Sequence, residues 1–377
     1  MKMVARIGKQ ASCPCKSGLK FGDCHGKAPE PFVNTLDQIN DDPRFSPTWK
    51  AMVAARVPFE GVHPSFVFQG KRMRFVGDKL FQRPSEETFH EFILTLLRSV
   101  VGPHWFQKQK GLPIERQHQI CRWFEVTSVF LNLHRSKLVG TDKKQFSADA
   151  PGDVSDLLTL AHDVFHLINA RLFDRRIRKR LLDKKEFQGV RYEIAVAALM
   201  TRAGLKVQFV HHNDKKHHDF QAFDKKTNTS LAVEAKSRHR AGGLHEPGLA
   251  NMDRIKRGDI ASLIGQALEQ NPGGSPFVIF VDLNVPREPG TPVEKRPWFQ
   301  DVWTDMQSLG TPISEHPDEF SAIFLTNFWH HWYGAARSSG VEYLHIVSYC
   351  PRHPIADDLV GRLMAAVQNY SFAPRQV

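Results

Sequence analysis

The stretch SLAVEAKS, residues 230–237, decides the fold of this chain. In a β-strand the side chains alternate between two faces, so Leu231, Val233 and Ala235 point together into a core. Glu234 and Lys236 then share the other face, near the end of a strand that is expected to be buried. An unpaired buried charge is costly, and a divalent cation would compensate for it.

Two further carboxylates are expected close to this pair. Asp219 lies on the preceding strand candidate, residues 218–224. Glu193 lies in a helix candidate at residues 186–204, on the apolar side of the helical wheel, whereas Arg191 lies roughly opposite. A carboxylate on the apolar side of an otherwise well-sorted helix is unusual. We therefore predict that this helix turns Glu193 toward the same site.

Three carboxylates and a lysine are suited to the hydrolysis of a phosphodiester. Oxygen atoms are the ligands that Mg²⁺ and Mn²⁺ prefer, and we expect Asp219 and Glu234 to hold such an ion. The ion would polarise the phosphate, lower the pKa of a bound water and offset charge on the leaving oxygen. Lys236 can orient the attacking water or help to deprotonate it.

A glutamate on a helix, an aspartate on a strand and E-x-K on the next strand resemble the PD-(D/E)xK nuclease superfamily, over roughly residues 186–285. The resemblance implies a restriction-endonuclease-like core, with a mixed sheet flanked by helices. It implies that Asp219 and Glu234 bind the catalytic metal and that Lys236 serves the nucleophile. Glu193 would be the helix acid of many members, and Gln266 a glutamine that some members carry near the site.

Two observations leave alternatives open. His218 stands where the family has a proline before the aspartate, and E-x-K is frequent by chance, so Glu234 and Lys236 could form a surface ion pair. The alternative function is a binding module that holds nucleic acid or a protein on a nuclease-like core without cutting it. Divalent-metal dependence separates the two, because cleavage needs the ion and binding does not.

The rest of the chain predicts an α/β fold. Strand candidates at 205–212 and 218–224 precede SLAVEAKS, a helix is expected at 259–270, and nearly continuous apolar runs at 276–284, 321–327 and 343–349 are typical of strands covered on both faces. Residues 65–78 read as a hairpin. The predicted domains are a zinc knuckle (1–28), a linker (29–43), a mostly helical domain (44–183) and the nuclease-like domain (184–377).

The zinc knuckle is predicted from CPCKSGLKFGDCHG, residues 13–26. Cys13, Cys15, Cys24 and His25 supply four ligands for a tetrahedral Zn²⁺, which leaves no open position and makes the site structural. Metal binding would stabilise a segment too small to form a core. The pattern resembles the SEC-C motif, although Lys16 stands where that family usually has glycine. The motif implies an accessory module, for docking to a protein partner or a target.

The net charge of +11 favours a polyanionic partner, and we expect nucleic acid, with DNA favoured over RNA. The basic segment RLFDRRIRKRLLDKK, residues 171–185, is either a solvated helix face or a phosphate-contacting patch. The N-terminal residues lack the apolar core of a signal peptide, and no apolar run approaches the length of a membrane span. These observations predict a cytoplasmic protein that is not inserted in a membrane.

Overall fold

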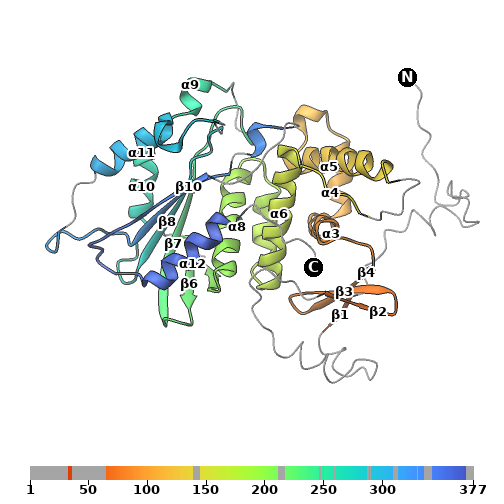
Figure 1. Ribbon diagram of the computed structural model, residues 1–377, viewed down its shortest axis with the longest axis horizontal. Coiled ribbons are helices and arrows are strands. Elements are labelled where there is room, and N and C mark those ends of the chain that lie inside the picture. Colours follow the sequence, from red (N-terminus) through yellow and green to blue (C-terminus); the bar gives the residue numbers. More distant parts are fainter. Residues whose placement is uncertain are drawn as a thin grey trace, which may run out of the picture. The chain divides into compact units, whose positions relative to one another are not determined.

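The structure is a computed structural model of the 377-residue chain, shown in Figure 1. The chain divides into two compact units, one of residues 1–56 and 63–85 and the other of residues 57–62 and 86–377. The structure describes residues 33–35, 65–138, 145–210, 217–245, 248, 250–258, 260–286, 288, 290–308, 313–328, 330–334 and 342–370.

The first unit contains a small antiparallel sheet in the order β1-β4-β3-β2. Gln69 and Gly70 connect β2 to β3 and both have positive φ, 48° and 72°, as a tight two-residue hairpin turn requires. The hairpin predicted at residues 65–78 is therefore confirmed. The strands are β1 (Val33–Thr35), β2 (Ser65–Phe68), β3 (Lys71–Val76) and β4 (Lys79–Pro84).

The second unit begins with helices and continues into the large sheet. Its first helix is fixed by a capping box, in which the side chain of Thr88 accepts from the Glu91 backbone N–H and the Glu91 carboxylate accepts from that of Thr88. The helices before the sheet are α3 (Phe89–Val101), α4 (Pro103–Lys110), α5 (Gln119–Ser136), α6 (Gly152–Asn169), α7 (Arg175–Leu181) and α8 (Phe187–Arg202).

The large sheet has six strands in the order β10-β9-β8-β7-β6-β5. β7, β8 and β9 are parallel to one another, whereas the other neighbouring pairs are antiparallel. The predicted α/β class with a mixed sheet flanked by helices is confirmed, and the restriction-endonuclease-like topology stays a prediction. The strands are β5 (Lys206–Phe209), β6 (Phe220–Asp224), β7 (Thr229–Ser237), β8 (Phe277–Asp282), β9 (Ala322–Asn327) and β10 (Glu342–Val347).

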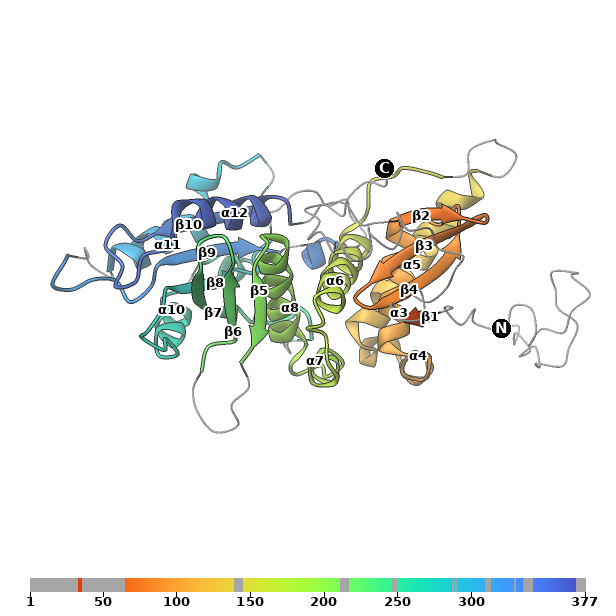
Figure 2. The same cartoon turned by 90° about the horizontal axis from the view of Figure 1, so that it is seen from below.

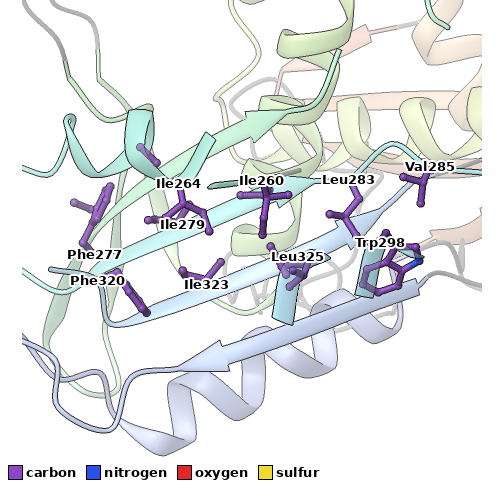
Figure 3. Packing of buried hydrophobic residues seen from close by; sticks show 14 residues of the cluster. Ile260, Ile264, Phe277, Ile279, Leu283, Val285, Trp298, Phe320, Ile323 and Leu325 are labelled. Carbon is purple, nitrogen blue, oxygen red and sulfur yellow. The ribbon is translucent and has the colours of Figure 1, made fainter. Parts of the chain in front are cut away.

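Helices α10 and α11 cover one face of this sheet. Every residue of β8 and β9 is buried, as the continuous apolar runs predicted. Figure 3 shows Ile264 of α10 next to Ile279 of β8, and Ile323 of β9 and Trp298 of α11 belong to the same buried cluster. The helices that follow β7 are α9 (Met252–Ile255), α10 (Ala261–Leu268), α11 (Pro297–Ser308) and α12 (Asp357–Gln368).

Helix α8 packs against the opposite face, and in Figures 1 and 2 it lies between the sheet and α6. The hydroxyl groups of Tyr192 and Thr326 are 2.8 Å apart and tie α8 to β9. Phe280 and Phe324 stack on this face with ring centroids 4.8 Å apart. Among the described residues, no helix is both long enough and apolar enough to cross a membrane.

The prediction that Arg191 lies on the polar side of α8 is wrong. Its side chain is buried and donates to the carboxylate of Asp156 on α6, which is fully buried. Because α8 is covered by the sheet and by α6, it has little solvated surface, and its arginine is accommodated by an ion pair instead of by water. A helical wheel cannot indicate this, since it assumes one buried side.

Candidate functional site

The site is built around the end of β7. Ala232 packs in the cluster beneath α10, and because side chains alternate along a strand, Glu234 and Lys236 lie on that same face. The Lys236 Nζ is 2.5 Å from the Glu234 Oε1. The side chain of Glu234 is 1% exposed and that of Lys236 is 19% exposed. The glutamate is thus enclosed, while the ammonium group reaches toward solvent.

Asp219 is held beside Glu234 by two hydrogen bonds. The Asp219 backbone N–H donates to the Glu234 Oε2 over 3.1 Å, and the Ala235 N–H donates to the Asp219 Oδ2 over 2.8 Å. These contacts follow from the antiparallel register, in which Phe220 pairs with Val233. The structure therefore brings together the aspartate, glutamate and lysine that the sequence singled out.

The two carboxylates resist ionisation. Burial raises the pKa of Asp219 well above its usual value, and the negative charges of Glu234 and Glu193 raise it further. Burial also raises the pKa of Glu234, although the ammonium group of Lys236 acts in the opposite direction. The pair is an electrostatically strained cluster, and a cation placed between the carboxylates would relieve it.

Glu193 lies close enough to affect both carboxylates electrostatically, but its own carboxylate is already bound. Arg180 of α7 donates to both of its oxygens, Nη1 to Oε2 over 2.6 Å and Nη2 to Oε1 over 2.7 Å. The Arg180 Nε also donates to Glu186, just before α8 begins. Sequence reasoning missed this arginine, because a pairing between two helices depends on how they pack.

A cleft of about 390 Å³ opens beside Lys236. Gln266 of α10 and Gly189 of α8 line it from opposite helices, and Arg238 and His239 line it from the loop after β7. The lysine and glutamine predicted to belong to one site therefore border the same space. The cleft is large enough to admit a phosphate group with its attached sugar.

The loop after β7 is held by buried amide side chains. The carbonyl oxygen of Arg238 accepts from the Gln188 Nε2 over 2.6 Å and from the Asn284 Nδ2 over 2.9 Å. Arg240 is 6% exposed, and its guanidinium donates to backbone carbonyls of the surrounding loops, including that of Arg257 over 2.6 Å. Two arginines that look alike in the sequence thus differ, because Arg240 stabilises the loop and Arg238 borders the cleft.

The chemistry of the donor set fits a hard divalent cation. Asp219, directly before β6, and Glu234 on β7 present their carboxylate groups close together, and burial raises the pKa of both. Within the described part of the chain, no group of three or more His, Cys, Asp or Glu side chains is arranged for a metal. Mg²⁺ commonly uses one or two carboxylates, with water and substrate phosphate completing its shell.

The predicted zinc site lies outside the described residues, because all of Cys13, Cys15, Cys24 and His25 fall in the undescribed N-terminal region. Comparisons of the chain with protein-family models, curated proteins and solved structures found no match.

Proposed function

We propose that the protein is a metal-dependent nuclease that hydrolyses phosphodiester bonds in nucleic acid, with DNA favoured. One observation carries this proposal: Asp219 and Glu234 lie together behind Lys236, which borders a cleft, and burial raises the pKa of both carboxylates. A purely structural ion pair would need only Glu234 and Lys236. The added carboxylate of Asp219 destabilises the fold locally, and a catalytic role explains its presence.

Each residue of the cluster has a distinct role in the proposed reaction. Asp219 and Glu234 would hold Mg²⁺ or Mn²⁺, which when bound polarises the phosphate and offsets charge on the leaving oxygen. Lys236 is held by Glu234 at the border of the cleft, where its ammonium group can donate to a phosphate oxygen or orient the attacking water. Gln266, on the facing helix, can position the scissile phosphate by a hydrogen bond from its amide.

Glu193 acts as a positioning residue in this proposal. The negative charge of Glu193 raises the pKa of Asp219 and thereby favours the binding of a cation at the site. Arg180 holds the Glu193 carboxylate in place. The zinc knuckle proposed for residues 1–28 would dock a protein partner or a target, apart from the catalytic chemistry.

A cleavage panel tests the proposal and names the substrate class. Plasmid, linear duplex, single-stranded DNA and RNA are incubated with the protein in Mg²⁺ or Mn²⁺ and then in chelator. Lys236→Met retains the length of the side chain without its charge, and Lys226→Met, at an exposed turn on the other end of the strands, is the matched control. Cleavage that needs metal and Lys236, but not Lys226, supports the nuclease. Binding that persists in chelator without any cleavage by the unaltered protein would instead identify a non-catalytic module.

A further inference from the structure

Helix α7 presents three cations on one exposed side. Arg175, Arg176 and Lys179 are all exposed, and their spacing places them on neighbouring positions of one helix face, which we call the basic face. Ile177 and Leu181 are buried on the opposite side. No acidic residue lies within α7, so the basic face has no partner of opposite charge at helical spacing inside its own helix.

The interior side of α7 fixes this face relative to the cleft. Arg178 donates to the carbonyl oxygens of Val100 and Val101 over 2.7 and 2.8 Å, which anchors α7 to the end of α3. Arg180 donates to Glu186, the residue directly before α8, and to Glu193 on the side of α8 that faces α7. Figure 2 shows α7 next to α8. The basic face is thus held beside the same side of α8 that approaches the carboxylate cluster.

Gly189 lies between these two glutamates on that side of α8 and lines the cleft. A Cβ atom at this position would meet no atom within 4 Å, and the residue does not have positive φ. Neither close packing nor backbone conformation therefore requires glycine, although glycine in a helix is less stable than alanine by about 1 kcal/mol. The missing side chain leaves open space on α8 at the border of the cleft.

We propose that the basic face of α7 and the gap at Gly189 form a track along which the sugar-phosphate backbone of a nucleic acid enters the cleft. This inference rests on the proposed function and adds the path of the substrate. A polyanion with regularly spaced charges is the partner that fits, because three cations on one rigid helix can contact successive phosphates. The open space at Gly189 lets the backbone approach α8 closely before it reaches Lys236 and Arg238.

The test is a binding titration of the full chain with a labelled DNA duplex in chelator, at several salt concentrations. The triple variant Arg175→Gln, Arg176→Gln, Lys179→Gln is expected to bind roughly 10- to 100-fold more weakly. Each lost phosphate contact lowers the slope of log K against log salt by about 0.9, so the slope should fall by roughly 2 to 3. Glutamine preserves helix propensity, and an unchanged urea melt would show that the variant is folded.

The matched control removes the same charge elsewhere. Lys206→Gln, Lys225→Gln, Lys226→Gln alters three exposed lysines at the end of β5–β7 that is remote from Glu234. This control should retain the affinity and salt slope of the unaltered protein. Equal losses in the two triple variants would overturn the inference, because net charge alone would then explain binding. An unchanged affinity in the α7 variant, or a loss confined to anionic-lipid vesicles, would also overturn it.

A substitution at the gap tests the path itself. Gly189→Gln projects a side chain into open space and should raise the KM for duplex cleavage several-fold, while leaving the urea melt unchanged or improved. An unchanged KM would overturn the path. If the unaltered protein cleaves DNA but the variants change neither binding nor KM, the proposed track is wrong and the proposed nuclease activity is retained. If binding depends on the α7 cations but no cleavage occurs, the proposed nuclease activity is wrong and the proposed binding surface is retained.

Discussion

Replacing Asp219 by asparagine is expected to stabilise the fold while removing function. The pKa of Asp219 is raised well above its usual value by burial and by the charges of Glu234 and Glu193, so the folded protein binds a proton there more tightly than the unfolded chain does. Stability therefore decreases as the pH rises from the unfolded pKa through the folded pKa. At neutral pH the asparagine variant avoids this loss, and its amide oxygen can still accept from the Ala235 N–H.

The expected gain is that of a typical single substitution. Asparagine removes the buried negative charge, and since single substitutions usually change stability by about 0.5–3 kcal/mol, we expect a gain of about 1–3 kcal/mol. Asp224, at the far end of β6 from Asp219, is the matched control. Its pKa is lowered, because hydrogen bonds from Thr227 and Arg362 outweigh the effect of burial. In the unaltered protein the Arg362 Nη2 is 2.5 Å from the Asp224 Oδ2. Asp224→Asn weakens this contact and should destabilise the fold by about 1–3 kcal/mol.

Urea titrations at neutral pH measure both free energies of unfolding. Opposite signs for Asp219→Asn and Asp224→Asn are expected, and a repeat with Mg²⁺ should stabilise the unaltered protein but not the Asp219 variant, since ligand binding to the folded state adds to stability. A destabilised Asp219→Asn variant would refute the reasoning. It would show that the aspartate is held by favourable contacts, as Asp224 is, and that the cluster does not need a cation.

Two further predictions concern stability away from the carboxylates. His118 and His245 accept hydrogen bonds from backbone N–H groups at the start of α5, and burial lowers the pKa of His118 to about 3 and that of His245 to about 4. Both must remain neutral in the folded protein, so stability should fall as the pH drops from about 6.5 toward 4. In urea melts, His245→Asn should reduce the loss of unfolding free energy between pH 7 and pH 5 by about 1–2 kcal/mol. Gly189→Ala should stabilise α8 by about 0.5–1 kcal/mol in the same assay, whereas Gly152→Ala should destabilise α6 clearly, because its Cβ would lie 2.2 Å from the His330 carbonyl oxygen. A pH-independent melt, or equal effects at the two glycines, would contradict these expectations.

The strands were predictable because their signals are local. Continuous apolar runs produced β8 and β9, and the alternation in SLAVEAKS placed Glu234 and Lys236 on one face, as the structure has them. Asp219 could be placed beside them because neighbouring antiparallel strands bring their residues into register. These inferences need only the strand period and chain order.

The remaining features depend on packing between distant segments. Arg180 and Arg191 look alike in the sequence, but one binds Glu193 at the edge of the site and the other is buried against α6. Likewise Arg238 borders the cleft while Arg240 holds loops together. Which arginine takes which role depends on how helices and loops pack against one another. No periodicity in the sequence indicates that packing.

The most direct test of the central claim is the single-turnover rate of duplex DNA cleavage in Mg²⁺ by the unaltered protein and by Glu234→Gln. This substitution keeps the size of the side chain and removes the charge that is expected to hold both the cation and Lys236. The account predicts metal-dependent cleavage by the unaltered protein and a rate at least about 100-fold lower in the variant, the scale typical of losing a catalytic group. Equal rates in the two proteins would contradict the account, because they would place the cleavage chemistry elsewhere in the chain.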